Sequence, residues 1–230
     1  MVWRKWKDLP EGMQTEDVRP YYEILDRKKN SLFLKNIFDK TAAIFMLVVL
    51  SPVFVVIAIL IKADSKGPVF YRQERVTQYG KKFRIHKFRT MTEHADQEGT
   101  LVTVENDSRI TKAGRLLRDK RLDELPQLID VLQGNMSFVG VRPEVPRFVK
   151  GYTPKMRATL LLPAGITNIT SIYYRNEAEL LESAEDADRI YMEEILPEKM
   201  EWNLKGLREY GFWREIGVMF RTVFSVWGKV

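Results

Sequence analysis

The stretch from Thr41 to Ile61, TAAIFMLVVLSPVFVVIAILI, decides how this chain can fold. Its 21 residues carry no charge, and Lys40 and Lys62 bound it. About 20 apolar residues are what an α-helix needs to cross the hydrocarbon core of a bilayer. Ser51-Pro52 lies in the middle, however, where proline removes a helix hydrogen bond and clashes with the preceding turn. The stretch therefore predicts an apolar helix that is broken or kinked at its centre.

Three arrangements of this helix are compatible with the residues. A bilayer tolerates a straight span with a proline kink, a soluble core can bury a long helix, and a re-entrant hairpin can enter the membrane and return to the same side. A signal peptide is not expected, because the stretch begins late and no cleavage site of small residues follows it. The positive-inside rule favours neither end, since basic residues flank both. Arg27, Lys28, Lys29, Lys35 and Lys40 precede the stretch, and Lys62, Lys66, Arg72, Arg75 and Lys81 follow it.

The composition of the chain indicates an anionic partner. Among 230 residues, 37 lysines and arginines outnumber 31 aspartates and glutamates, which gives a formal net charge of +6. Such an excess suits phospholipid headgroups, nucleotides or nucleic acids. Because the basic residues are spread along the chain and do not form one run, we expect no nucleic-acid partner. The chain has no cysteine, which excludes disulfides, thiolate metal sites and a cysteine nucleophile.

The pattern along the chain predicts a helix-rich α+β fold in three parts. Residues 1–30 are polar with scattered aromatic side chains and predict a peripheral arm on the membrane surface. Residues 31–66 hold the apolar helix, and residues 67–230 form the remaining domain. In this domain, residues 69–75 and 81–91 predict two strands joined by a turn. Residues 92–107 show no periodicity and predict a mobile loop.

The rest of the domain is predicted to be mainly helical. Thr111 is expected to cap a short helix that runs through Asp119, and Asp123 is expected to cap the next helix. Residues 136–141 predict a short strand, and residues 176–196 predict an acidic helix. Residues 212–227 predict an amphipathic helix, which either lies in the membrane interface or packs on the core. Its apolar residues at helical spacing are Phe212, Ile216, Met219, Phe220, Val223 and Trp227.

Asp123 and Glu124 are the first candidates for chemistry. Two adjacent carboxylates at a helix start ordinarily serve as caps and compensate the helix dipole. The basic residues near this pair are Arg115, Arg118, Lys120 and Arg121. Such a setting suits an anionic phosphate. Since adjacent helical residues point about 100° apart, one carboxylate can attack phosphorus while the other binds a divalent metal such as magnesium.

Two further segments add cations that suit a phosphate. In an alternating run of residues, Lys87 and Arg89 share one face. Arg142 precedes Pro143, which restricts the backbone of Arg142 to extended geometry and gives a fixed guanidinium. Each feature also has an ordinary interpretation: a solvated strand face for the first, and an ion pair with a nearby acid for the second.

The remaining motif search is negative. His86 and His94 are not spaced as metal ligands of one another, and both are expected at the surface. The sequence contains no P-loop, no dinucleotide glycine fingerprint and no zinc motif.

Five short motifs follow the apolar segment in a fixed order. They are KFRTM (Lys87–Met91), DSRITKAGRLLR (Asp107–Arg118), LDELPQL (Leu122–Leu128), GNMSFVGVRPE (Gly134–Glu144) and GIT (Gly165–Thr167). Together with the central Ser51-Pro52, this set resembles the bacterial sugar transferase family, the polyprenyl-phosphate sugar-1-phosphate transferases, also called monotopic phosphoglycosyl transferases. The resemblance covers residues 32–230, and the short length is similar to that of members with little more than the catalytic domain.

The resemblance implies a membrane topology and a reaction. It implies that the apolar helix is re-entrant and broken at Ser51-Pro52, with the catalytic domain on the cytoplasmic face of the bacterial inner membrane. It implies transfer of a sugar-1-phosphate from a UDP-sugar to a polyprenyl phosphate, with release of UMP and with magnesium as cofactor, at the start of glycoconjugate or polysaccharide assembly. The family's nucleophile, which forms a phosphosugar-aspartyl intermediate, matches Asp123, and its magnesium ligand matches Glu124. The implied diphosphate-binding positions are Lys87, Arg89, Arg118 and Arg142, with Pro143 in the loop that presents Arg142.

The chain departs from the family pattern at two places. Val141 stands where the family usually has proline, and the loop from Pro163 to Asn168 has an additional Ala164 and ends in asparagine in place of glycine. These departures leave the sugar and nucleotide contacts open, as they leave the glycan pathway and the oligomeric state. Two other functions stay compatible with the residues: a magnesium-dependent phosphohydrolase, in which water replaces the lipid acceptor, and a basic membrane-anchored scaffold without catalysis.

Overall fold

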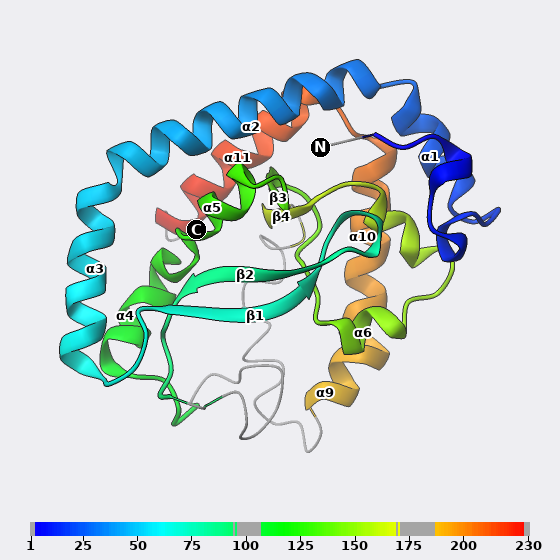
Figure 1. The fold of residues 1–230 in the computed structure, drawn as a ribbon. Coiled ribbons are helices and arrows are strands. Elements are labelled where there is room, and N and C mark those ends of the chain that lie inside the picture. The colour runs from blue at the N-terminus through cyan, green and yellow to red at the C-terminus, as the bar shows by residue number, and fades with distance from the viewer. Residues whose placement is uncertain (1–2, 94, 96–106, 169, 171–186, 228–230) are drawn as a thin grey trace.

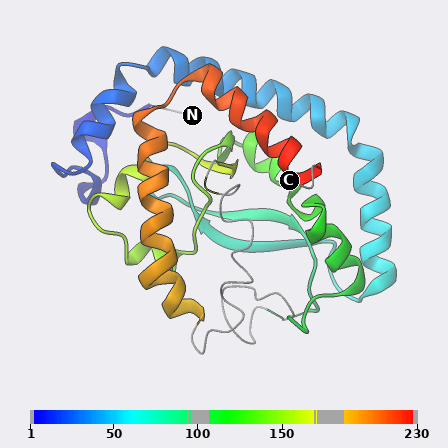
Figure 2. The ribbon, with the colours of Figure 1, turned by 180° about the vertical axis from the view of Figure 1, so that it is seen from behind.

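A continuous arc of three helices encloses one side of the molecule (Figure 1). It consists of α1 (Arg19–Asp26), α2 (Lys29–Val49) and α3 (Ser51–Asp64). The computed structural model describes all residues except 1–2, 94, 96–106, 169, 171–186 and 228–230. Two small sheets and the shorter helices lie inside the arc (Figures 1 and 2). The described residues therefore form a helix-rich α+β fold, as predicted.

The predicted break at Ser51-Pro52 is confirmed. α2 ends just before it, and α3 is bent away from α2 by 62°. Pro52 lies in the first turn of α3, where its missing N–H leaves no helical hydrogen bond unmade. The Ser51 hydroxyl donates to the Val48 carbonyl at 2.8 Å across the break. No single described helix is long and apolar enough to cross a bilayer, but α2 and α3 taken together are, by length and composition.

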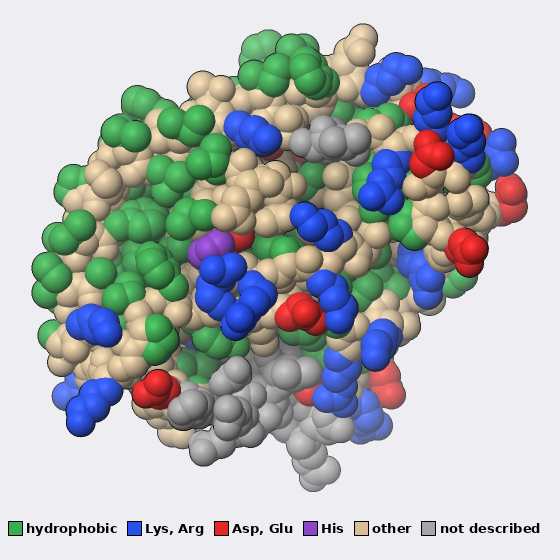
Figure 3. All heavy atoms as spheres, viewed as in Figure 1, with side chains coloured by type: hydrophobic (Ala, Val, Ile, Leu, Met, Phe, Trp, Pro, Cys, Tyr) green, Lys and Arg blue, Asp and Glu red, His purple; other side chains and the backbone are tan. Residues whose placement is uncertain are grey.

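The outer side of the α2–α3 pair is apolar although it is exposed. Phe45 and Val48 are each 68% exposed, and Ile59 is 63% exposed. Figure 3 shows hydrophobic side chains spread over this side of the molecule. The inner side differs, because Ala43 and Ile57 are buried against the rest of the domain. An exposed apolar surface of this extent marks a surface that contacts another apolar phase or partner.

Two two-stranded sheets lie inside the arc. β1 (Phe70–Val76) and β2 (Lys82–Phe88) are antiparallel, which confirms the predicted hairpin. β2 ends earlier than predicted, and Met91 makes only an isolated bridge to the chain beyond. β3 (Met136–Val139) and β4 (Ala164–Thr167) are parallel and form the second sheet. Of the predicted loop at 92–107, residues 94 and 96–106 lie outside the described residues.

A buried polar cluster fixes α2 to the second sheet. Lys35 donates to Asp39 at 2.6 Å and to the Ser137 hydroxyl at 3.0 Å, and Ser137 donates to Asp39 at 2.6 Å. Lys35 and Asp39 are 5% and 4% exposed. Because a buried charge is tolerated only when it is paired and hydrogen-bonded, this cluster holds the start of the apolar pair against β3.

Residues 3–28 are not the peripheral arm that the sequence predicts. Their apolar side chains, among them Leu9, Val18 and Leu25, are buried in one hydrophobic cluster. The other side of this cluster comes from distant residues such as Leu161 and Leu204. The aromatic residues of this region were therefore a signal of core packing, and residues 3–28 pack as part of the domain.

Two short helices frame the predicted catalytic pair. α4 (Lys112–Asp119) begins at Thr111, whose hydroxyl accepts from the Gly114 N–H at 3.0 Å, so this cap is confirmed. The prediction that Asp123 caps the next helix is wrong. α5 (Gln127–Leu132) follows Pro126 without a side-chain cap, and Asp123 lies inside a separate 3-10 turn.

The described C-terminal region contains two longer helical segments, one that ends with α10 and one formed by α11. α9 (Ala187–Ile190), a π-helical turn (Tyr191–Ile195) and α10 (Leu196–Arg208) are continuous, so the predicted acidic helix extends further than expected, and its residues 176–186 lie outside the described residues. α6 (Pro146–Lys150) is a short helix after β3. α11 (Phe212–Trp227) has the predicted bounds and runs beside α2 (Figure 2). Trp213 and Phe220 of α11 are 81% and 62% exposed, whereas its Val218 is buried.

The parallel pairing of β3 with β4 brings two glycines into backbone contact. A Cβ atom on Gly165 would lie 2.1 Å from the Gly140 nitrogen, which real side chains do not tolerate. The Gly165 N–H donates to the Val141 carbonyl at 2.9 Å, and the Gly140 N–H donates to the Thr167 carbonyl at 3.0 Å. Only residues without side chains fit this crossing, which fixes the chain that leaves β3.

We expect Gly165→Ala to separate β3 from β4. The free energy of unfolding should fall by about 2 kcal/mol, as for other overpacked sites, and thermal or denaturant unfolding in detergent would measure it. Gly217→Ala is the matched control, because nothing lies within 4 Å of a Cβ at this position in α11. The control should keep or slightly raise stability, since alanine favours helix over glycine. Equal stability of Gly165→Ala and the wild type would contradict the close crossing.

Candidate active site

Asp123 and Glu124 lie in the 3-10 turn Leu122–Glu124, between α4 and α5. Both side chains are buried, at 7% and 8% exposure. Arg121, directly before the turn, has a left-handed backbone (φ 54°), which is uncommon for a residue other than glycine. This reversal of the chain directs the two carboxylates into the domain. A position at a helix cap would instead have left them at the surface.

Glu124 is held by two cations from different parts of the fold. Lys87, near the end of β2, donates to Glu124 Oε1 at 2.9 Å. Arg142, in the segment after β3, donates to Oε1 at 2.5 Å and to Oε2 at 3.3 Å. Burial raises the pKa of Glu124, but Arg142 and Lys87 outweigh burial and hold this pKa well below its ordinary value. Glu124 is therefore an ionised, fully engaged carboxylate.

Asp123 has a different environment from its neighbour. Burial raises the pKa of Asp123, and the negative charge of Glu124 raises it further, while Lys87, Arg118 and Arg142 act in the opposite direction. Among the described residues, no hydrogen bond engages the Asp123 carboxylate. The pair thus divides into one carboxylate that is tied down and one that is available to react.

The structure brings three of the predicted cations to this pair and leaves one elsewhere. Lys87, Arg118 and Arg142 all act electrostatically on Asp123, and Arg118 is oriented by its bond to the Thr90 hydroxyl at 3.0 Å. Arg89 is directed away, because its guanidinium donates to the Ser65 and Lys66 carbonyls at 2.8 and 2.6 Å. Its predicted contact with a diphosphate has no support from this arrangement.

One further cation, Arg75 of β1, was missed by the sequence analysis. Its guanidinium donates to the Pro143 carbonyl at 3.0 Å, beside Arg142. Its charge also lowers the pKa of Lys87, after the larger effect of burial on that lysine. The strand pairing contains the signal that could have found it: Arg75 lies on the same face of the hairpin as Lys87.

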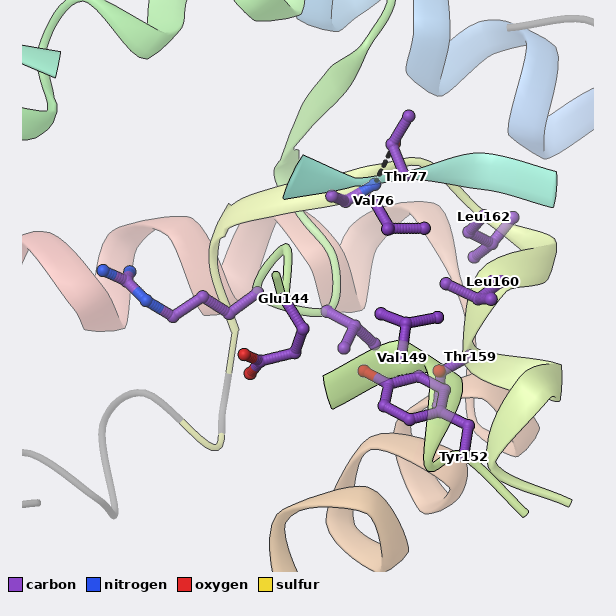
Figure 4. A pocket seen from close by; sticks show the side chains of 11 residues that line it. Val76, Thr77, Glu144, Val149, Tyr152, Thr159, Leu160 and Leu162 are labelled. Carbon is purple, nitrogen blue, oxygen red and sulfur yellow. Dashed lines mark hydrogen bonds between the residues drawn. The ribbon is translucent and has the colours of Figure 1, made fainter. Parts of the chain in front are cut away.

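A small cavity lies behind the segment that carries Arg142 (Figure 4). Its walls are mainly apolar, with Val76, Val149 and Leu160 among them. At its rim, Glu144 accepts a hydrogen bond from the Tyr191 hydroxyl at 2.6 Å. Thr77, Arg142, Tyr152 and Thr159 also line it, but Asp123 and Glu124 do not, so this cavity backs the Arg142 segment and is not the reacting centre.

His86 is buried and not at the surface, contrary to the prediction. Its backbone N–H and its ring Nδ1 each lie 2.8 Å from an oxygen of Asp130, which is completely buried in α5. Burial raises the pKa of Asp130, and the two bonds to His86 act against this rise. Within the part of the chain that the structure describes, β1 is the strand partner of β2 along one edge, so Asp130 supplies an acceptor for the other edge. His94 lies outside the described residues.

Glu124 and Asp123 are the carboxylates of this site that could hold a metal ion. No group of three or more histidine, cysteine, aspartate or glutamate side chains that could hold a metal occurs in the described part of the chain. Magnesium is commonly held by one or two carboxylates together with substrate phosphates. Glu124, with Asp123 beside it, provides this donor set, provided that Lys87 and Arg142 release its oxygens.

One known protein family matches most of this chain. The sequence profile of the family described as bacterial sugar transferase matches residues 30–229. The chain belongs to the bacterial sugar transferase family. The resemblance predicted from the motifs is thereby confirmed, and the match begins one residue after the start of α2.

Individual relatives within the bacterial sugar transferase family are longer than this chain. It is similar to the UDP-glucose:undecaprenyl-phosphate glucose-1-phosphate transferases of Klebsiella pneumoniae (32% identity, covering 92% of this chain and 45% of the relative) and Escherichia coli strain K12 (35%, 94% and 44%). It is also similar to the UDP-N-acetylgalactosamine-undecaprenyl-phosphate N-acetylgalactosaminephosphotransferase of Aeromonas hydrophila (30%, 84% and 44%). The chain thus spans less than half the length of these relatives.

We expect Asp130→Ala to destabilise β2. The substitution removes the acceptor of the His86 N–H, so the free energy of unfolding should fall by about 1–3 kcal/mol. Asp119→Ala is the matched control, because this aspartate at the end of α4 is exposed. Thermal unfolding in detergent would compare the two variants. A stability of Asp130→Ala equal to that of Asp119→Ala would show that the carboxylate does not hold the strand edge.

Proposed function

We propose that this chain transfers a sugar-1-phosphate from a UDP-sugar to undecaprenyl phosphate, or a similar polyprenyl phosphate, and releases UMP. One observation carries the proposal: the buried Asp123–Glu124 pair meets cations from three separate parts of the chain in a domain that also bears a bent apolar helix pair. The relatives compared above are named for a UDP-sugar and undecaprenyl phosphate. A soluble nucleotide and a lipid phosphate can meet only at a membrane boundary, which suits such a molecule.

The donor diphosphate is proposed to bind by exchange of ion-pair partners. Lys87 and Arg142 are engaged with Glu124 in this structure. A diphosphate offers them more negative charge than a single carboxylate, so these cations can transfer to it. Glu124 is then the carboxylate that we assign to magnesium, which when bound would neutralise charge on the diphosphate.

Asp123 is proposed as the nucleophile. One of its carboxylate oxygens attacks the β-phosphorus, which carries the sugar, and a bond between that oxygen and phosphorus forms. The bond from this phosphorus to the bridging oxygen breaks, and UMP leaves with the electron pair. An oxygen of the polyprenyl phosphate then attacks the same phosphorus and releases Asp123. A covalent intermediate of this kind lets two different substrates use one site in turn.

The α2–α3 pair is proposed to enter the membrane as a re-entrant hairpin. Its 62° bend and its exposed apolar outer side support this topology. Trp213 and Phe220 of α11 are exposed on a helix that also carries arginine, which suits contact with phospholipid at the interface. In this arrangement the catalytic domain lies on the cytoplasmic face of the bacterial inner membrane.

We expect Asp123→Asn to abolish turnover, with a loss on the order of 10,000-fold, as for other removed nucleophiles. An amide is a poor nucleophile, so this variant should form no covalent adduct. With a UDP-sugar, magnesium and no lipid, the wild type should release up to about one UMP per active site. Intact-mass spectrometry should then detect a phosphosugar adduct on the wild type alone. Glu124→Gln should reduce both the rate and its dependence on magnesium.

Asp119→Asn is the control for these variants, because Asp119 is exposed and should be neutral for turnover. UMP release that requires lipid, without an adduct, would refute the covalent role of Asp123. Accumulation of free sugar-1-phosphate with lipid present would instead identify a phosphohydrolase.

We expect both ends of the α2–α3 pair to face the cytoplasm. The chain has no cysteine, so single cysteines at Lys29 and Lys66, which are both exposed, can report the topology. Lys35 is unsuitable as a probe site because it is buried and paired with Asp39. An impermeant thiol reagent should label neither site in intact cells and both after permeabilisation. Labelling of one site alone from outside would establish a span and exclude the hairpin.

A further inference from the structure

Arg142 reaches Glu124 from a segment without regular secondary structure. Residues 140–145 connect β3 to α6 and form neither helix nor strand. A guanidinium on such a segment has a defined position only if the backbone beneath it is held, because an unheld segment samples many conformations. The position of Arg142 therefore depends on the anchors of its own backbone.

Three carbonyl groups on residues 141–144 of this segment are anchored. The Val141 carbonyl accepts from the Gly165 N–H at 2.9 Å, and the Glu144 carbonyl accepts from the Val76 N–H at 2.9 Å. The Pro143 carbonyl, next to Arg142, accepts from Arg75 Nη1 at 3.0 Å. The first two anchors are backbone groups that any sequence retains, whereas the third is a side chain. Arg75 is thus the anchor of this segment that a side-chain substitution can remove.

Arg75 is itself held in place before it reaches the segment. Its Nε and Nη2 atoms donate to the Gln73 side-chain oxygen at 3.0 and 2.6 Å. Gln73 precedes it by two residues on the same face of β1, so the strand sets the separation of the two side chains. A guanidinium with planar, divergent donors can bond to Gln73 and Pro143 at once, which an ammonium with one nitrogen cannot do in this geometry.

We infer that Arg75 is a positioning residue for Arg142: by holding the Pro143 carbonyl, it sets the place of the guanidinium that grips the donor diphosphate. The inference rests on the proposed function for the identity of the ligand. Arg75 touches no group of the Asp123–Glu124 pair through a hydrogen bond within the described residues, so it acts through Arg142.

Two other roles of Arg75 would look similar in a single variant. It could stabilise β1 without affecting the site, or its charge could attract the nucleotide directly from its place near Lys87. A double-mutant cycle separates these roles from positioning, because two residues that act as a unit give losses that do not add.

The test measures the affinity of the detergent-solubilised full chain for UDP by titration calorimetry, with thermal unfolding as a parallel readout. Arg142→Ala and Arg75→Ala should each weaken binding about 10-fold, and the double variant should be within about 3-fold of Arg142→Ala alone. Arg75→Lys keeps the charge but should remain nearer to Arg75→Ala than to the wild type. Arg72→Ala is the matched control, because the side chain of this exposed arginine of β1 lies on the opposite face and, among the described residues, bonds only to the Arg84 carbonyl.

Several outcomes would overturn the inference. Losses that multiply in the double variant, or full recovery in Arg75→Lys, would show that charge matters and positioning does not. A lower unfolding temperature with unchanged UDP affinity would show a role in the strand alone. If the wild type neither binds UDP nor releases UMP, the proposed function fails; if it does both and the losses multiply, only the role of Arg75 fails.

Discussion

A buried carboxylate, that of Glu124, is the constraint on which the arrangement of this domain depends. An anion removed from water must be paired and hydrogen-bonded, or the fold loses several kcal/mol. Lys87 supplies the pairing from β2, and Arg142 supplies it from the irregular segment after β3. Each of them must then be held in turn. Asp130 holds the free edge of β2, which carries Lys87, and the Gly140–Gly165 crossing holds the chain that leads to Arg142.

The apolar helix pair and the candidate active site are joined through Arg89. This residue follows β2 and donates to the carbonyls of Ser65 and Lys66, just beyond the end of α3. Lys87 is only two residues earlier, so the end of α3 and the partner of Glu124 keep a defined separation. This contact explains the burial of Arg89. It also gives a route by which the position of the apolar pair fixes the position of the site.

The errors of the sequence analysis have physical causes that a local sequence pattern does not contain. His86 was expected at the surface, but it bonds to Asp130, which is 44 residues away in the chain. Asp123 was expected to cap a helix, but the left-handed Arg121 places it in a separate turn. Residues 3–28 were expected to be peripheral, but their apolar side chains meet those of α10. In each case, the deciding contact joins residues that no local pattern connects, or depends on a backbone conformation that the residue type does not favour.

The sequence by itself determined the features that arise within one turn or one strand. Proline cannot continue a hydrogen-bonded helix, so the break at Ser51-Pro52 follows from two residues, and the Thr111 cap and the β1–β2 hairpin follow from similarly short patterns. The motifs were also sufficient for the family. Only the tertiary structure decided that Glu124 is engaged by Lys87 and Arg142 while Asp123 is not, and that Arg75 supports Arg142. Charges distant in sequence pair according to which elements pack together, and packing is a property of the whole chain.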